Sequence, residues 1–221
     1  MGTSNWQNIS YNIELLRKLD PKSILDVGVG FGRWGILFRE FLEIWDNGRY
    51  NGKWQVVIDG VEIFHGYIKD YHKYFYNEIY LQNALEFLET TNKAYDLINF
   101  GDVIEYFTKE EGVKLIELAL KKGKNVLINI PIGSYWAQEG TDENPYEEHK
   151  SVWHNNDFTG YRYNIIKTFY DLSEREFSVV LLSAEKIRFT KKYGKHFKLK
   201  NYLKNRFGLK KLVEKFEQKR K

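Results

Sequence analysis

The sequence predicts an α/β fold with a mostly parallel, mixed sheet and helices on both of its faces. Three observations support this prediction. Apolar, β-prone runs alternate with segments of helical spacing throughout residues 1–190. A glycine-rich turn joins the first such run to the first such segment. The chain has only three prolines and no internal repeat. Strands separated by segments of helix length favour crossover connections and therefore parallel pairing.

The expected elements can be followed along the chain. The first strand is the apolar run at 23–27, and the segment at 34–45 has apolar residues at helical spacing. A turn-rich stretch (46–53) separates this helix from the next strand. Further strands are expected at 56–64, 78–81, 95–100 and 125–130, with helical segments at 68–75, 84–88 and 109–121. A last pair of strands, at 167–170 and 177–183, completes the sheet. In such sheets, ligands bind at the carboxyl ends of the strands.

Composition and charge divide the chain into two parts. The 221 residues include no cysteine, which excludes disulfides, thiolate zinc sites and a cysteine nucleophile. No signal segment and no apolar run of membrane-spanning length is present, so we expect a cytoplasmic protein. The formal charge of +4 combines about −7 in residues 1–190 with +11 in residues 191–221. We therefore expect a globular domain at 1–190 and a basic tail at 191–221.

The strongest local signal is ILDVGVGFGRWG at residues 24–35. A strand ends near Asp26, the chain turns through Gly28, Gly30 and Gly32, and an amphipathic helix follows. Glycines in this position let backbone N–H groups approach a nucleotide-type ligand closely. Gly30, Gly32 and Gly35 also satisfy the G-x-G-x-x-G pattern of dinucleotide binding, which keeps an NAD(P)-dependent oxidoreductase open.

Register and charge favour another cofactor class. The glycine that directly follows the strand is Gly28, and an acid stands two residues before it. A carboxylate at Asp26 that faces the loop repels a pyrophosphate but suits a sulfonium or ammonium group. The pattern D-x-G-x-G-x-G at 26–32 resembles motif I of the class I S-adenosylmethionine-dependent methyltransferases. The resemblance implies a Rossmann-like, seven-stranded fold, S-adenosylmethionine as cofactor, and cofactor contacts from Asp26, Gly28, Gly30 and Gly32.

Further stretches resemble the same superfamily, over about residues 20–160. The second strand closes on Glu62 and Ile63, where the family has an acid that accepts hydrogen bonds from the ribose hydroxyls, with Asp59 as a rival. Asn83 and Ala84 stand where the family has Gly-Asp-Ala at the adenine. Asn83 departs from that pattern, although its amide oxygen can accept the same hydrogen bond.

The segment YDLINFGDVIEYF at 95–107 resembles the family's fourth strand and the turn after it. The resemblance places Phe100 and Gly101 against the methionine end of the cofactor. Asp102 and Glu105 are expected to point towards the substrate or to cap the next helix, and we take Glu105 as a candidate catalytic residue. Tyr106 replaces the family's common histidine.

The sequence N-P-Y-x-x-H-x-x-x-W at 144–153 resembles a loop that lies over the active site in sugar-modifying and natural-product-modifying members. His149 is therefore a candidate general base, because an imidazole can take a hydroxyl proton near neutral pH. The acids around it are interpreted as a solvated face, and we expect no metal. Aromatic residues of the 133–163 segment are candidates for an acceptor pocket.

The basic tail has apolar residues at Leu209, Leu212, Val213 and Phe216, a spacing that predicts an amphipathic helix. Docking on the body or on a partner chain is ranked first, an anionic membrane surface second and nucleic acid third. The sequence thus predicts methyl transfer to a small-molecule acceptor, such as a sugar or glycan hydroxyl. An RNA methyltransferase, an NAD(P)-dependent oxidoreductase and a non-catalytic cofactor-binding subunit remain the alternatives.

Overall fold

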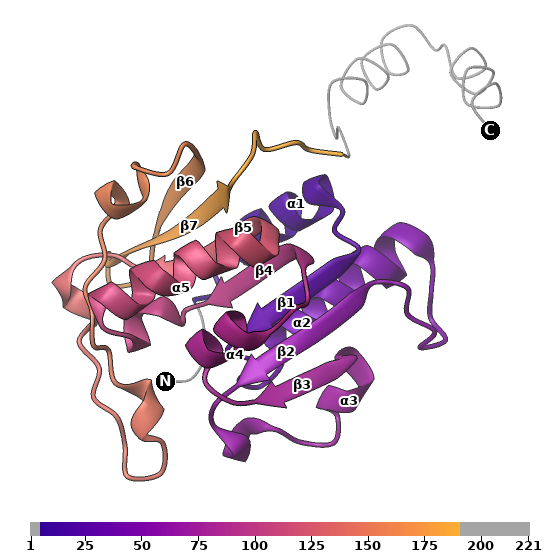
Figure 1. Cartoon of the computed structure of the whole chain (residues 1–221), viewed down its shortest axis with the longest axis horizontal. Helices are drawn as coiled ribbons and strands as arrows, with labels where there is room; N and C mark the ends of the chain where they lie inside the picture. The colour runs from indigo at the N-terminus through magenta and orange to yellow at the C-terminus, as the bar shows by residue number, and fades with distance from the viewer. Residues whose placement is uncertain (1–4, 191–221) are drawn as a thin grey trace, which may run out of the picture.

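The structure is a computed structural model that describes residues 5–190 (Figure 1). Its sheet consists of β1 (Ser23–Val27), β2 (Val57–Glu62), β3 (Glu78–Leu81), β4 (Tyr95–Gly101), β5 (Gly123–Pro131), β6 (Tyr163–Tyr170) and β7 (Glu176–Ser183). The α-helices are α1 (Ile9–Leu19), α2 (Arg33–Arg39), α3 (His72–Phe75), α4 (Ala84–Thr90) and α5 (Lys109–Lys122). The sequence-predicted alternation of strands and helices is therefore confirmed.

The seven strands form one sheet in the order β3-β2-β1-β4-β5-β7-β6. Strands β1 to β5 pair in parallel, whereas β7 runs antiparallel between β5 and β6. Because the order reverses direction beside β1, the carboxyl ends of β1 and β4 mark a topological switch point, where open α/β sheets bind ligands. The predicted mixed, mostly parallel sheet with a terminal strand pair is confirmed.

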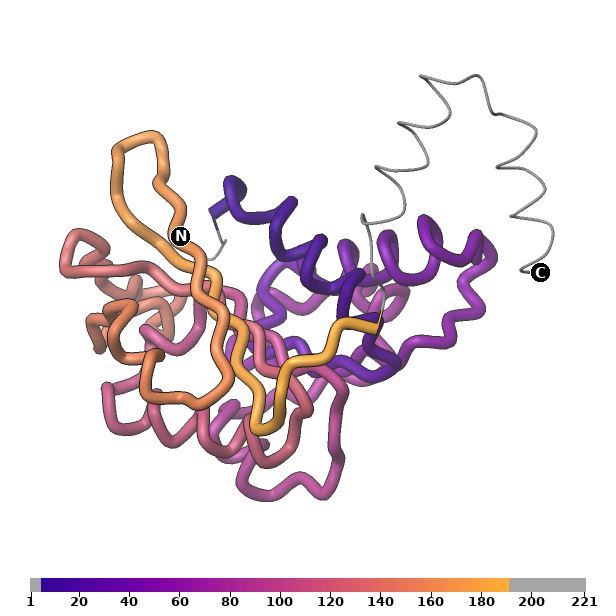
Figure 2. The backbone as a smooth tube through the Cα atoms, turned by 90° about the horizontal axis from the view of Figure 1, so that it is seen from above, coloured from indigo at the N-terminus to yellow at the C-terminus, as the bar shows by residue number. Residues whose placement is uncertain are grey.

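Helices cover both faces of the sheet, with α1 and α2 on one side and α4 and α5 on the other (Figure 2). The side of α1 and α2 holds a core that includes Leu16, Phe38 and Ile58, and the opposite side holds one that includes Leu88 and Ile116. Strands buried on both faces consist of near-continuous apolar runs, which explains why β1, β2, β4 and β5 were recognisable from sequence.

Three elements differ from expectation. Helix α1 was not predicted, and its buried face includes a polar residue, Asn12, which a hydrophobic pattern does not recognise. The expected helix at 34–45 is α2 followed by a π-helix, η1 (Glu40–Trp45). The expected helical segment at 68–75 is helical only in its last turn, α3, and is preceded by a 3₁₀ turn, η2 (His65–Tyr67).

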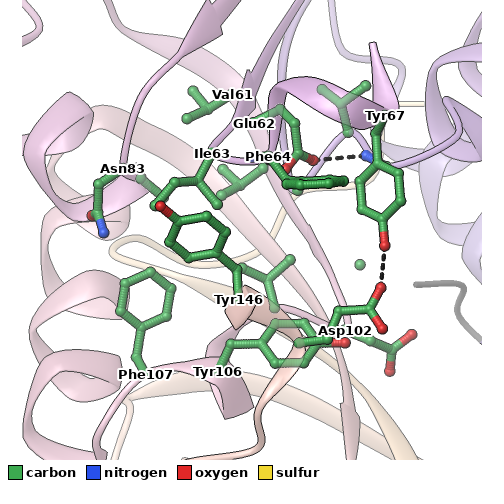
Figure 3. A pocket seen from close by; sticks show the side chains of 18 of the residues that line it. Val61, Glu62, Ile63, Phe64, Tyr67, Asn83, Asp102, Tyr106, Phe107 and Tyr146 are labelled. Carbon is green, nitrogen blue, oxygen red and sulfur yellow. Dashed lines mark hydrogen bonds between the residues drawn. The ribbon is translucent and has the colours of Figure 1, made fainter. Parts of the chain in front are cut away.

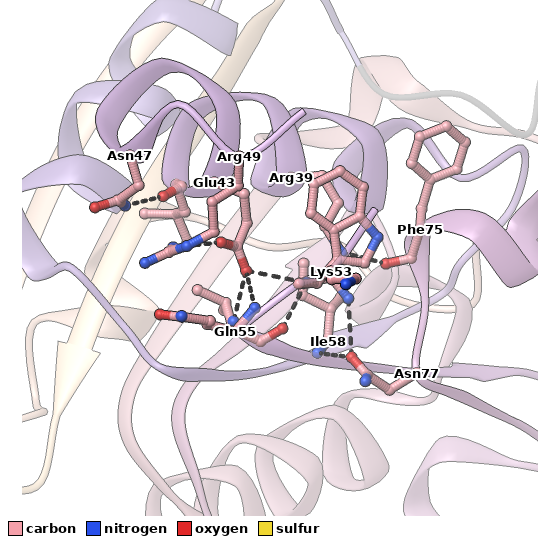
Figure 4. Close-up of polar contacts among 12 residues, drawn as sticks. Arg39, Glu43, Asn47, Arg49, Lys53, Gln55, Ile58, Phe75 and Asn77 are labelled. Carbon is pink, nitrogen blue, oxygen red and sulfur yellow. Dashed lines mark hydrogen bonds and ion pairs between the residues drawn. The ribbon is translucent and has the colours of Figure 1, made fainter. Parts of the chain in front are cut away.

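A buried ion pair joins α2 and η1 to the loops on either side of β2 (Figure 4). Arg39 and Glu43 are almost fully buried, and their charged groups approach to 3.6 Å. Arg39 donates to the carbonyl oxygen of Phe75 and to Asn77 Oδ1, both at 2.8 Å. Glu43 Oε1 accepts from the Val56 N–H at 2.6 Å. Because each of these partners satisfies part of the buried charge, this network fixes the C-terminal end of α3 relative to α2.

The basic tail at residues 191–221, with its predicted helix, lies outside the described residues. Within residues 5–190, no helix is both long and apolar enough to cross a membrane.

Candidate active site

A cavity of about 390 Å³ lies at the carboxyl ends of β1, β2 and β4 (Figure 3). Its volume is in the range of small-molecule sites. The lining comes from the segments that follow β1, β2, β3 and β4 and from one distant loop, 144–150. Of the residues expected to form the site, it contains Gly28, Gly30, Glu62, Ile63, Asn83, Ala84 and Gly101. Residues far apart in sequence are thus brought together where the strand-end argument placed them.

The glycine loop, residues 28–32, requires its glycines for conformational and steric reasons. Gly28, Gly30 and Gly32 have φ angles of +76°, +52° and +81°. A Cβ on Gly28 would lie 2.4 Å from Val103 Cγ2. The Gly28 N–H donates to the carbonyl oxygen of Val61 at 2.9 Å, which holds the loop against the end of β2. A left-handed backbone at three alternate positions directs peptide groups towards the cavity without side chains in between.

Glu62 is the carboxylate that closes β2, and it faces the cavity. Its Oε2 accepts from the Gly30 N–H at 2.9 Å and its Oε1 accepts from the Phe64 N–H at 2.8 Å. Burial raises the pKa of Glu62, against the lowering effect of these backbone hydrogen bonds. Each carboxylate oxygen has further lone-pair capacity for a ligand hydroxyl. The rival Asp59 is buried elsewhere, where it accepts from Lys93 and Tyr95.

One side of the cavity combines apolar side chains with the start of α4. Asn83 is the N-cap of α4, and its Oδ1 accepts from the Leu85 N–H at 2.8 Å. The adjacent N–H of Ala84 belongs to the first turn, where backbone donors have no partner within the helix. Ile63, Phe107 and Tyr146 lie nearby in Figure 3. Apolar walls beside amide donors and acceptors suit a flat heteroaromatic ring.

Three expected contacts are placed outside the cavity. Asp26 is fully buried beneath the loop, where it accepts from Tyr76 Oη at 2.6 Å and from Asn99 Nδ2 at 2.9 Å. Burial raises its pKa to about 7. Gly32 is the buried N-cap of α2, and Phe100 points into the core on the side of α4 and α5. Because side chains alternate along a strand, these residues support the site from behind, and the expectation that Asp26 faces the ligand is corrected.

The two acids in the turn after β4, Asp102 and Glu105, lie in different places. Asp102 lines the cavity and has a left-handed backbone, with φ of +56°. Glu105 is buried and does not line the cavity, and burial, together with the charge of Asp102, raises its pKa well above the usual range. Neither acid caps α5, because the cap is a Thr108–Glu111 capping box. Glu105 is therefore a buried carboxyl behind the site, which differs from the expectation that it points towards the substrate.

His149 does not line the cavity. It is half-buried behind Tyr106, which does, and the two ring centroids are 5.1 Å apart. Burial lowers the pKa of His149, so the imidazole is neutral at pH 7. The backbone of this loop is fixed to the turn after β4, since the N–H groups of Lys150 and Ser151 donate to the carbonyl oxygen of Glu105 at 2.8 and 3.2 Å.

The loop at 144–150 reaches across the cavity to Tyr67. Tyr67 Oη donates to Glu147 and accepts from Asn144 Nδ2 at 3.0 Å. Burial and the Glu147 carboxylate raise the pKa of Tyr67 to about 12. Of the aromatic residues at 133–163, Tyr146 lines the cavity, whereas Trp153 belongs to the core and stacks on Phe158. Of the aromatic residues in that segment that were expected to form an acceptor pocket, Tyr146 is therefore the one that lines the cavity.

Several lining residues were not singled out from the sequence, among them Trp34, Phe64, Phe107 and Lys150. Phe64 follows Glu62 by two residues. The rule that ligands bind at the carboxyl ends of the strands would have identified Phe64 if it had been applied to every residue after β2 and not to the acid alone. Trp34 was interpreted only as part of a helical stripe. Its buried indole N–H has no acceptor among residues 5–190, and it lies against Gly101, where an added Cβ would be 2.2 Å away. A buried donor at a cavity wall fits a ligand oxygen.

The charge of the lining favours a cationic ligand over a pyrophosphate. Four carboxylates, Glu62, Asp102, Glu111 and Glu147, line the cavity, against two basic residues, Arg33 and Lys150. No group of three or more His, Asp or Glu side chains within residues 5–190 is arranged to hold a metal ion. The negative charge that suits a sulfonium group and repels a pyrophosphate therefore comes from Glu62 and the other lining carboxylates, and not from Asp26.

Comparisons of sequence find no match, either among family models or among curated proteins. Comparison of structures finds many. A SAM-dependent methyltransferase from Archaeoglobus fulgidus matches at 15% identity with a TM-score of 0.54, covering 79% of this chain and 94% of that one. The methyltransferase domain of bacterial CtHen1 matches at 14% identity and a TM-score of 0.52, covering 80% and 97%.

The N-terminal domain of EvdMO1, solved in the presence of S-adenosylhomocysteine (SAH) and D-fucose, matches at 13% identity and a TM-score of 0.52, covering 82% of this chain and 85% of that one. Identities this low establish shared architecture. Together with the strand order, they show that this chain has the Rossmann-like fold of the class I S-adenosylmethionine-dependent methyltransferases.

Proposed function

We propose that this chain transfers a methyl group from S-adenosylmethionine to a hydroxyl of a small-molecule acceptor, such as a sugar or glycan. The observation that carries the proposal is the Glu62 carboxylate, which closes β2, binds the Gly30 N–H and faces a cavity lined by the left-handed Gly28 and Gly30. The fold neighbours support the same cofactor, and one of them was solved with SAH and D-fucose.

The residues present fit the proposed cofactor. Glu62 would accept hydrogen bonds from the ribose hydroxyls, and Asn83 and the Ala84 N–H would meet the adenine edge between Ile63, Phe107 and Tyr146. The Trp34 indole N–H and the glycine loop remain for the amino-acid end. When bound, the cofactor supplies a methyl group activated by a positively charged sulfur. The surplus of carboxylates in the lining stabilises that charge, and the protein otherwise acts by alignment.

The acceptor is proposed to enter between Asp102, Tyr106 and Tyr67, on the opposite side of the cavity from Asn83 (Figure 3). Burial and the nearby acids raise the pKa of Tyr106, so its hydroxyl stays protonated and can orient an acceptor oxygen. His149 is kept as the proposed proton acceptor, reached through Tyr106, because it is neutral at pH 7. Glu105 is proposed to support the loop through its carbonyl oxygen.

Calorimetry with the full chain tests the cofactor. We expect S-adenosylmethionine and SAH to bind and NAD not to bind. Glu62→Gln should weaken SAH binding by about 10-fold or more, because hydrogen bonds to a charged acceptor contribute about 1.5–3 kcal/mol. The matched control is Glu78→Gln, an exposed acid on the neighbouring strand β3, which should leave the affinity unchanged. Binding of NAD alone would overturn the proposal in favour of a dehydrogenase.

The acceptor class is tested by measuring how much SAH the full chain forms and releases from S-adenosylmethionine when D-fucose, other hexoses or a short RNA is added. We expect release with a sugar. Release with RNA alone, lost at high salt, would support an RNA methyltransferase instead. SAH binding without release on any acceptor would favour a non-catalytic subunit.

A further inference from the structure

Two buried side chains outside the cavity contact the glycine loop from α3. His72 is the first residue of α3, and Tyr76 directly follows its end, so the two are one helical turn apart. His72 is fully buried and Tyr76 is 4% exposed. Neither lines the cavity. Their rings lie together, with centroids 6.2 Å apart.

His72 fixes the carbonyl of Gly30. Its Nδ1 lies 3.0 Å from the Lys69 nitrogen and 3.1 Å from the Lys69 carbonyl oxygen, and its Nε2 lies 3.1 Å from the Gly30 carbonyl oxygen. Because a carbonyl oxygen can only accept, the contact with Gly30 is a hydrogen bond in which the Nε2–H donates. The Gly30 N–H is meanwhile bound to Glu62. The central glycine of the loop is thus held through both of its polar groups, one by β2 and one by α3.

Tyr76 fixes the two ends of the same turn. Its hydroxyl donates to Asp26 at 2.6 Å, before the loop, and accepts from the Gly35 N–H at 3.1 Å, after it. The two rings also fill the space beside the glycines. A Cβ would lie 3.0 Å from the His72 ring at Gly32 and 2.4 Å from the Tyr76 ring at Gly35. Two glycines of the G-x-G-x-x-G pattern are therefore required by α3, independently of any ligand.

The position of α3 is itself fixed. The buried Arg39 guanidinium donates to the carbonyl oxygen of Phe75, the last residue of α3, and to Asn77 beyond it. Arg39 is on α2, the helix that the glycine loop begins. The loop, α2 and α3 thus form a closed set of hydrogen bonds around the buried Asp26.

We propose that His72 and Tyr76 are positioning residues of the cofactor site, which hold the glycine loop in its ligand-receiving conformation before any ligand is bound. The inference rests on the proposed function for the identity of the ligand. A loop that is ordered in advance does not lose conformational freedom on binding, so its restraints contribute to affinity without touching the ligand.

The test compares variants of the full chain by calorimetry with SAH. His72→Leu fills the space but cannot donate, and it should weaken binding about 10-fold. His72→Gln, whose amide can donate to Gly30 and accept from Lys69, should stay within about threefold of wild type. Tyr76→Phe should also weaken binding, whereas the control Tyr74→Phe, an exposed tyrosine of the same helix, should not.

Amide hydrogen exchange of residues 28–33 in the ligand-free chain gives a second readout. We expect faster exchange in His72→Leu and Tyr76→Phe, and wild-type exchange in His72→Gln and Tyr74→Phe. Equal amide exchange of the loop in His72→Leu and wild type overturns the inference. A loss of SAH affinity in His72→Gln as large as that in His72→Leu also overturns it. If His72→Leu does not fold, Tyr76→Phe, which removes one oxygen, makes the same comparison. Absence of SAH binding to wild type contradicts the proposed function, while the exchange result still decides this one.

Discussion

At the scale of single residues, Asp26 and Glu62 show what the sequence reveals about a carboxylate. Both stand at the end of a buried strand, and both were expected to face a ligand. Glu62 does so because it is the last residue of β2 and its side chain points to the cavity. Asp26 precedes the end of β1 by one residue, which directs it under the loop towards Tyr76. Which acid is exposed depends on the final register of the strand, and no local pattern encodes it.

The buried Asp26 makes the stability of the protein depend on pH. Its pKa rises from 3.8 in the unfolded chain to about 7 in the fold, because burial disfavours its charge. The folded state therefore binds the proton more tightly. The contribution of the Asp26 proton to the free energy of unfolding is fully present below about pH 4 and is lost as the pH rises through about 7.

Denaturant unfolding of wild type and Asp26→Asn at pH 5 and pH 8 measures this effect. Relative to the variant, wild type should lose about 2–3 kcal/mol of unfolding free energy between these two values. An equal change in both proteins would show that Asp26 does not titrate in this interval.

At the scale of elements, strands were easier to predict than helices. Strands β1, β2, β4 and β5 are mostly buried and therefore appear as short apolar runs. Helix α1 has no side-chain cap at Asn8, and the amides of Asn8 and Asn12 both donate to Asn129 on β5. The apolar stripe of α1 is short, consisting of Leu15, Leu16 and Leu19, and the N-terminal part of the helix docks through amides, which a hydrophobic pattern does not recognise.

Helix α2 also has a residue that its local propensity would not select. Gly35 lies inside α2, where alanine is favoured by about 1 kcal/mol. A Cβ there would meet the Tyr76 ring at 2.4 Å, which costs more than that propensity gains. Gly35→Ala should therefore lower the free energy of unfolding by about 1–3 kcal/mol in denaturant titration. Gly160→Ala, with no atom within 4 Å of the added Cβ, should change it by less than about 0.5 kcal/mol and serves as the control.

At the scale of the whole molecule, the cavity and the excess of basic residues lie in different parts of the sequence. All cavity-lining residues fall between Val27 and Lys150, which precede the basic residues 191–221 in the sequence. The division into a globular domain at 1–190 and a basic tail stays a prediction, because residues 191–221 lie outside the described residues. The partner expected for the tail, whether protein, membrane or nucleic acid, stays a prediction.

Removal of residues 191–221 should therefore leave the affinity for SAH within about twofold of the full chain in calorimetry, because it removes no lining residue. A loss of 10-fold or more would show that the tail contributes to the cofactor site.

The antiparallel strand β7 has a consequence for how this protein is made. It lies between β5 and β6 although it is last in sequence, and it pairs with β5 from Pro131 to Asn125. During synthesis from the N-terminus, all cavity residues emerge before residues 176–183 do. Until then β5 presents a long apolar edge with unpaired backbone groups. The nascent chain therefore passes through an interval in which all cavity residues have been synthesised while one edge of β5 is still unpaired.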